Sequence, residues 1–108
     1  MSELPASLVV PALVRRVSAA GGFATVLHRG QAQGSALVVV HRSRDGLQTA
    51  WERLPSPSGA PEWRQAAEGE EGVKTFIARQ RRFDPDLWVI ELDIGEPARF
   101  IEGFPAVC

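Results

Sequence analysis

A chain of 108 residues is about the usual size of one domain, so residues 1–108 are expected to form a single domain. Apolar residues make up 44% of the chain and charged residues 23%, which is typical of a globular domain and excludes a disordered one. The formal net charge of −1 creates no overall field that would attract nucleic acid or an anionic membrane. Neither is expected as a partner.

The chain has one cysteine, Cys108, at its last position. A single cysteine excludes a disulfide framework and any metal site built from several cysteines of one chain. The N-terminal residues lack the cationic and apolar segments of a signal peptide, and the apolar runs are far shorter than the roughly 20 residues that cross a bilayer. These features predict a cytoplasmic protein.

The first predicted helix begins near Pro11 and ends before Gly21. Proline fits the first helical turn and disfavours helical geometry in the residue before it, so residues 8–10 are expected to be extended. Glycine suits the left-handed residue that ends a helix. The apolar stripe of this helix consists of Val10, Leu13, Val14 and Val17.

Two segments rich in β-branched residues, 23–29 and 35–42, predict strands. The short linker 30–34 has a glycine at each end and is typical of a β-hairpin turn. The two strands are therefore expected to pair with each other.

A second turn is predicted at Asp45-Gly46, a dipeptide typical of a type I′ hairpin turn. It leads to a third strand at 47–54. The turn geometry is expected to place Trp51 beside Val40.

The second half of the chain predicts a weaker strand at 62–66, a helix at 70–82 and a strand at 87–93. A last short strand at 99–102 is expected to pair with the strand before it. One face of the strand at 87–93 carries Trp88, Ile90 and Leu92.

The order of the elements predicts an α+β domain of two layers. Two helices are expected to pack on a mostly antiparallel sheet of about four to six strands. Both faces of that sheet are apolar, whereas helices on one side cover only one face. The C-terminal strands, a helix on the second side or another protein must close the other face, and the last option motivates a homodimer.

The two histidines are the first candidates for catalysis or metal binding. In the predicted hairpin, His28 and His41 lie on opposite faces and about 16 Å apart at roughly 3.3 Å per residue, too far for one metal ion. No serine lies in a Gly-x-Ser-x-Gly motif, and Gly21-Gly22 precedes a strand rather than the helix that a phosphate-binding loop requires. These patterns favour a protein that is not an enzyme and holds no metal or cofactor.

The segment 79–93 holds the candidates for a binding surface. Three arginines end the second helix, more than a helix C-terminus needs, and an Asp-Pro-Asp turn follows them. Two of the arginines are three residues apart and share a helical face, so they could form a polar rim around an aromatic anchor, Phe83 or Trp88. The expected surface comprises Arg79, Arg82, Phe83, Asp84, Asp86 and Trp88.

The sequence predicts a small module for protein interaction or homodimerisation, and a flat apolar patch across a two-fold axis would favour it. The alternative is a small anionic-ligand or nucleotide-binding domain that uses Arg79 and Arg82. An exposed pocket ringed by those arginines and a histidine would favour the alternative. Nucleic-acid binding and a small enzyme fit the sequence less well. An enzyme would need a pocket in which His28 or His41 meets a carboxylate.

Two segments, RRVSAAGGFA at 15–24 and RRFDPDLWVIE at 81–91, resemble a small family of uncharacterised bacterial proteins, mostly from alphaproteobacteria, known as a domain of unknown function. Its members are similar in length, so the resemblance covers nearly the whole chain. It implies a bacterial cytoplasmic origin and a single domain, and it implies no activity, cofactor or catalytic residue.

Overall fold

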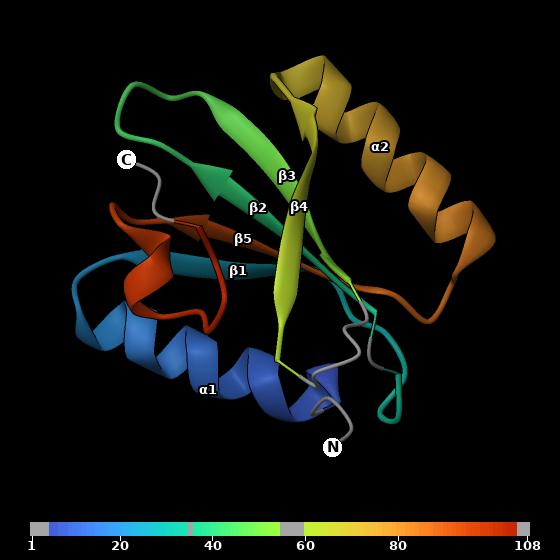
Figure 1. The fold of residues 1–108 in the computed structure, drawn as a ribbon, viewed down its shortest axis with the longest axis horizontal. Helices are drawn as coiled ribbons and strands as arrows, with labels where there is room; N and C mark the ends of the chain where they lie inside the picture. The colour runs from blue at the N-terminus through green and yellow to red at the C-terminus, as the bar shows by residue number, and fades with distance from the viewer. Residues whose placement is uncertain (1–4, 35, 55–59, 106–108) are drawn as a thin grey trace.

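A five-stranded mixed sheet lies between two helices (Figure 1). The computed structural model describes residues 5–34, 36–54 and 60–105. The strand order across the sheet is β1-β5-β2-β3-β4. The elements in chain order are α1 (Ala6–Ala19), β1 (Phe23–His28), β2 (Leu37–Arg42), β3 (Gln48–Leu54), β4 (Glu62–Glu68), α2 (Glu70–Phe83), β5 (Trp88–Asp93) and the 3₁₀ turn η1 (Pro97–Arg99).

The predicted α+β class and the mostly antiparallel sheet are confirmed. Three of the four strand pairs are antiparallel, and β2 with β5 is the parallel pair. The helices lie on opposite faces, so the sheet is the middle of three layers where the sequence predicted two. Neither helix is long and apolar enough to cross a membrane, within the residues that the structure describes.

The predicted hairpin between β1 and β2 is wrong, because β5 lies between these two strands. Five consecutive residues of β2 and the first three of β5 are buried. Strands buried on both faces belong in the middle of a sheet. No residue of β1 is fully buried, which suits the edge position that β1 occupies instead.

The turn between β2 and β3 also differs from the prediction. Gly46 has a φ of +87°, but Asp45 does not have the positive φ that a type I′ turn requires. The Gly46 amide donates to the Ser43 carbonyl at 2.9 Å, as in a type I turn followed by a left-handed glycine. Trp51 consequently pairs with Val39 rather than lying beside Val40, which turns the indole to the α1 face of the sheet.

Helix α1 begins at Ala6, several residues before the predicted start, and includes Pro11. Tertiary contacts override the unfavourable interior proline. The Ala6 amide donates to the Gly34 carbonyl at 3.0 Å, and Ala6 and Val10 are fully buried. The predicted end is confirmed, since Gly21 has a φ of +89° and the Gly22 amide donates to the Val17 carbonyl at 3.0 Å.

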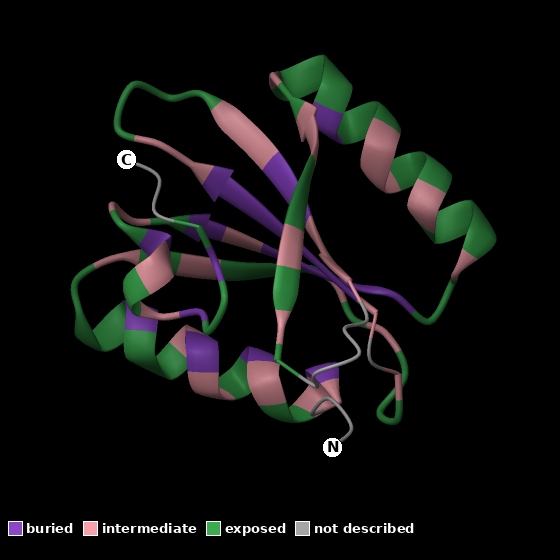
Figure 2. Ribbon diagram, in the orientation of Figure 1, coloured by how far each residue is buried: buried purple, intermediate pink, exposed green. Residues whose placement is uncertain are grey.

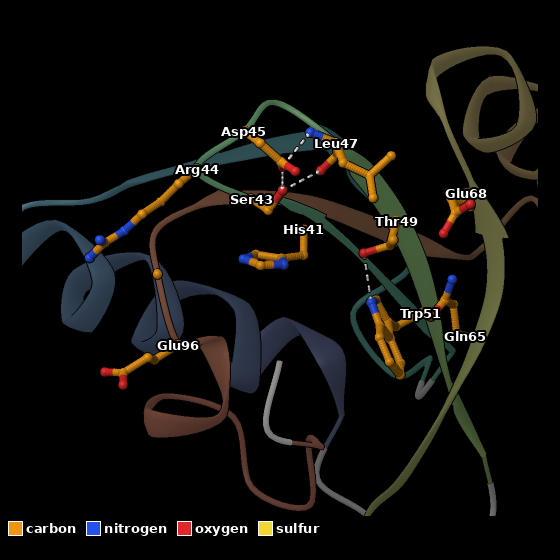
Figure 3. A pocket seen from close by; sticks show the side chains of 11 residues that line it. His41, Ser43, Arg44, Asp45, Leu47, Thr49, Trp51, Gln65, Glu68 and Glu96 are labelled. Atoms are coloured by element: carbon orange, nitrogen blue, oxygen red, sulfur yellow. Dashed lines mark hydrogen bonds between the residues drawn. The ribbon is translucent and has the colours of Figure 1, made fainter. Parts of the chain in front are cut away.

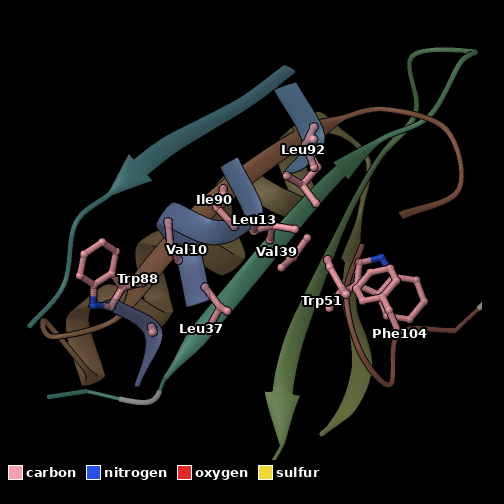
Figure 4. Packing of buried hydrophobic residues seen from close by; sticks show 12 residues of the cluster. Val10, Leu13, Leu37, Val39, Trp51, Trp88, Ile90, Leu92 and Phe104 are labelled. Atoms are coloured by element: carbon pink, nitrogen blue, oxygen red, sulfur yellow. The ribbon is translucent and has the colours of Figure 1, made fainter. Parts of the chain in front are cut away.

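Two apolar clusters fill the spaces on either side of the sheet, and the buried residues follow β2, β5 and one stripe of α1 (Figure 2). The second face, whose cover the sequence left open, is closed by α2 through Val73, Phe76 and Ile77. The cluster on the α1 face includes Val10, Leu13, Leu37, Val39, Trp88, Ile90 and Leu92, and Figure 4 shows these side chains between α1 and the sheet.

The C-terminal segment packs on the α1 face as a 3₁₀ turn, so the strand predicted at 99–102 is wrong. The Phe104 ring contacts Trp51 at 4.9 Å between centroids (Figure 4). It also contacts Trp63, at 5.4 Å. The Arg16 guanidinium donates to the Phe100 carbonyl at 3.1 Å and ties the segment to α1. Aromatic packing therefore holds this segment without any strand pairing.

Gly30 allows the loop after β1 to pass close to the turn before β5. An added Cβ would clash with the Asp86 carbonyl oxygen and lie 2.7 Å from Trp88 Cδ1. Gly30→Ala is therefore expected to lower the free energy of unfolding by about 2 kcal/mol or more, because rigid backbone must move. Urea denaturation measures this loss. Gly34→Ala is the control, since its Cβ would meet Asp86 at 3.4 Å, and an equal loss in both variants would contradict the prediction.

Candidate functional site

The six residues predicted to form one surface are divided between the core, a turn and an exposed helix end. Trp88 is 4% exposed and belongs to the cluster on the α1 face. Its Nε1 donates to the Gln31 carbonyl at 2.8 Å, and the Arg29 guanidinium lies 5.5 Å from the ring centroid. Trp88 therefore holds the loop after β1 and is not available as a surface anchor.

Asp84 and Asp86 form the turn that joins α2 to β5. The Asp84 carboxylate accepts the Asp86 amide at 3.1 Å, and the Asp84 carbonyl accepts the Leu87 amide at the same distance. The Asp86 carbonyl accepts the Gln31 amide, also at 3.1 Å. The first role of this pair is structural, as expected for Asp on either side of a proline.

The end of α2 is exposed and cationic. Phe83 is 80% exposed, and Arg79, Arg81 and Arg82 are exposed as well. Within the described ranges, no hydrogen bond or ion pair joins any of the three guanidinium groups to another part of the chain. These cations remain available to an outside group.

A pocket of about 310 Å³ lies between this end of α2 and β1. It is lined by His28, Ala78, Arg81, Arg82 and Pro85. An anionic-ligand site was expected to be ringed by Arg79, Arg82 and a histidine. This pocket contains Arg82 and His28, with Arg81 in place of Arg79. The spacing of residues 78, 81, 82 and 85 is that of one helical stripe, and this signal could have identified Arg81.

Arg79 lines a neighbouring depression of about 430 Å³ on the outer side of α2, which shares Ala78 and Arg82 with the pocket. All its lining residues belong to this one helix, and they include Glu71 and Lys74. The depression therefore combines both charge signs and has no wall from another element.

The two histidines lie on opposite sides of the sheet, as expected. His28 Nε2 lies 3.2 Å from the Pro85 carbonyl oxygen, and His41 Nε2 lies 2.9 Å from the Ile94 carbonyl oxygen. A carbonyl oxygen only accepts hydrogen bonds, so each histidine Nε2 carries a proton and donates the bond. In the described part of the chain neither ring bonds a carboxylate, which is the contact that an enzyme would need.

A larger pocket of about 720 Å³ is lined by His41, by the turns after β2 and β5, and by residues of β3 and β4 (Figure 3). The sequence did not predict it. Several of its polar groups are engaged with one another, because Ser43 donates to Asp45 and Thr49 accepts from Trp51 Nε1 at 3.0 Å. No three His, Cys, Asp or Glu side chains are grouped to hold a metal ion, so far as the described residues extend.

The edge strand β1 carries exposed apolar side chains. Phe23 is 72% exposed, Val26 41% and Leu27 47%. The register with β5 shifts between Val26 and His28, which marks a bulge at Leu27. Within the sheet as described, β5 is the one strand that pairs with β1, so the other edge of β1 faces outward.

These features define a small α+β domain with an open apolar edge and a cationic pocket. Residues 4–102 match the family model described as protein of unknown function DUF1491. The chain belongs to the DUF1491 family. This outcome agrees with the bacterial family that the sequence resembles.

Three solved structures of relatives share the fold. The solution structure of Atu0922 from A. tumefaciens is 30% identical, covers 97% of each chain and has a TM-score of 0.80. The crystal structure of a DUF1491 family protein from Caulobacter crescentus CB15 is 31% identical, with a TM-score of 0.75 and coverage of 84% of this chain and 88% of that chain. An NMR structure of a DUF1491 family protein from the same organism is 32% identical, with a TM-score of 0.72 and coverage of 82% and 84%. A comparison with curated proteins found no match.

Trp88 and Phe83 are expected to respond oppositely to truncation. Trp88→Ala should lower the free energy of unfolding by about 3–5 kcal/mol, because it empties a buried site. Phe83→Ala should change it by no more than about 0.5 kcal/mol, because the ring is exposed. Urea denaturation compares the two, and Trp88→Phe, which keeps most of the volume, covers the case in which Trp88→Ala does not fold. A large loss for Phe83→Ala would contradict this assignment.

The Ser43 hydroxyl holds the pKa of Asp45 below its usual value, with a smaller contribution from the Leu47 amide. A lowered pKa means that this contact stabilises the fold above the ordinary pKa of an aspartate and is lost as the pH falls through the folded value. Ser43→Ala should therefore raise the pKa of Asp45 part of the way to normal. NMR titration of the side-chain carboxyl carbon measures it, with Ser18→Ala on α1 as the control. An unchanged pKa in Ser43→Ala would refute the assignment.

Proposed function

We propose that this protein is a non-enzymatic interaction domain of the cytoplasm that forms a homodimer through the outer edge of β1. One observation carries the proposal: an edge strand presents Phe23, Val26 and Leu27 to solvent beside an unpaired backbone. Natural sheets usually protect their edges with charges or short strands, because open edges associate. An apolar open edge is therefore typical of an interface.

The opposite edge of the same sheet serves as an internal comparison. Strand β4 exposes Glu62, Arg64 and Glu68, and Arg64 pairs with Glu52 on β3 at 2.9 Å. Charges of this kind discourage a second chain from pairing. Between Phe23 and Leu27 the β1 strand has no charged residue at all. Charged side chains therefore protect the β4 edge of the sheet, and none protects the β1 edge between Phe23 and Leu27.

Antiparallel pairing of β1 with β1 of a second copy would form a closed dimer. A two-fold axis lets the same strand serve both subunits, and it extends the sheet across the interface without leaving a new open edge there. The bulge at Leu27 confines regular pairing to about the first four residues of β1. The interface should therefore be smaller than the standard area of about 1,600 Å² and the dimer correspondingly weak.

Equilibrium sedimentation tests the proposal. The wild-type chain should be partly dimeric at tens of micromolar, and Phe23→Lys with Leu27→Lys should make it monomeric, because charged residues on an edge strand oppose pairing with a second chain. The control is Leu8→Lys, which adds a lysine at an apolar residue of α1 that is 62% exposed. A wild-type monomer at these concentrations, or equal weakening by Leu8→Lys, would overturn the proposal.

A further inference from the structure

We infer that the pocket between α2 and β1 binds a phosphate group carried by a small molecule. This site is separate from the outer edge of β1 and does not depend on dimerisation. It draws on one of the predicted surface residues, Arg82, and adds two that the sequence did not select, His28 and Arg81.

The pocket is built by tertiary structure rather than by one helix surface. Helix α2 provides Ala78, Arg81 and Arg82, β1 provides His28, and the turn before β5 provides Pro85. Its volume of about 310 Å³ is at the small end of the range for ligand sites. A site of this size suits one compact charged group, with the rest of the molecule outside.

The charge of the pocket lining is positive. Arg81 and Arg82 have no partner among the described residues, and neither Asp84 nor Asp86 lines the pocket. The Asp84 carboxylate is engaged with the Asp86 amide. Guanidinium groups form forked hydrogen bonds with phosphate oxygens, which makes paired arginines typical phosphate ligands.

His28 provides the β1 wall of the pocket. Its Nε2 donates to the Pro85 carbonyl, which fixes the ring against the turn. The forked donors of Arg81 and Arg82 suit the three terminal oxygens of a phosphate better than the two oxygens of a carboxylate.

Arg79 provides a matched control on the same helix. It is exposed and unpaired like Arg82, and both line the outer depression with Glu71 and Lys74, but only Arg82 also lines the pocket. If the helix attracted anions only through its overall charge, loss of Arg79 and loss of Arg82 would have equal effects.

Amide chemical-shift titration of the full chain tests the site, with inorganic phosphate and adenosine 5′-monophosphate as probes. Both should produce saturable shifts centred on residues 28, 78, 81 and 82, and adenosine without phosphate should produce none. Tighter binding of adenosine 5′-monophosphate would identify a nucleotide as the source of the phosphate, and equal binding would identify the phosphate group alone. Absence of saturable shifts up to about 10 mM, ten times a millimolar Kd, would overturn the inference.

The variants locate the binding group. Arg81→Gln and Arg82→Gln should each weaken phosphate binding by about tenfold, because each removes charge-assisted hydrogen bonds, and Arg79→Gln should weaken it by less than about threefold. All three side chains are exposed, so the variants should fold like the wild type. Equal loss in all three would show a diffuse field rather than a site and would refute the pocket.

Discussion

The parallel pairing of β5 with β2 is the constraint on which the rest of the structure depends. Leu37 pairs with Trp88 and Val39 with Ile90, so the most apolar strands of the chain lie side by side in the middle of the sheet. A parallel pair needs a crossover connection, and the chain between these strands provides β3, β4 and α2 for it. The insertion of β5 also displaces β1 from β2 and makes β1 an edge strand.

This single displacement creates both surfaces that carry the proposals. With β1 at the edge, Phe23, Val26 and Leu27 are left exposed. The same displacement brings His28, at the end of β1, against Pro85 in the turn that leads from α2 to β5. In the hairpin expected from the sequence, His28 would have faced Ala36 and no pocket with the arginines of α2 would exist.

Local patterns predicted the elements, whereas the pairing of the strands depended on contacts distant in sequence. Helix α2 was predicted over 70–82 and spans Glu70–Phe83, because its apolar stripe and its acidic first turn are local signals. The choice between β2 and β5 as the neighbour of β1 rests on burial on both faces, which a short linker such as 30–34 does not reveal. The α1 start was missed because Pro11 has a strong local preference, which the buried Ala6 and Val10 outweigh.

The same difference between local patterns and distant contacts applies to the candidate site. The unusual composition of segment 79–93 selected residues that lie on both sides of the sheet. The composition does not reveal which side of the sheet each residue occupies. Trp88 pairs with Leu37 and faces α1, whereas Arg82 lies on the other side. The direction of a strand residue depends on register and on the layer above it, and both became known only with the position of β5.

Helix-end electrostatics alone do not account for three arginines within four residues. A cation at a helix C-terminus gains about 0.3–1 kcal/mol, but like charges three or four residues apart lose about 0.2–0.5 kcal/mol, so each further arginine adds little to stability. In the described residues none of the three offsets this repulsion with an ion pair. The phosphate inferred for the pocket would add charge-assisted hydrogen bonds of about 1.5–3 kcal/mol each at Arg81 and Arg82, more than a cation gains at a helix end. The inferred ligand therefore accounts for Arg81 and Arg82, which the helix end alone does not.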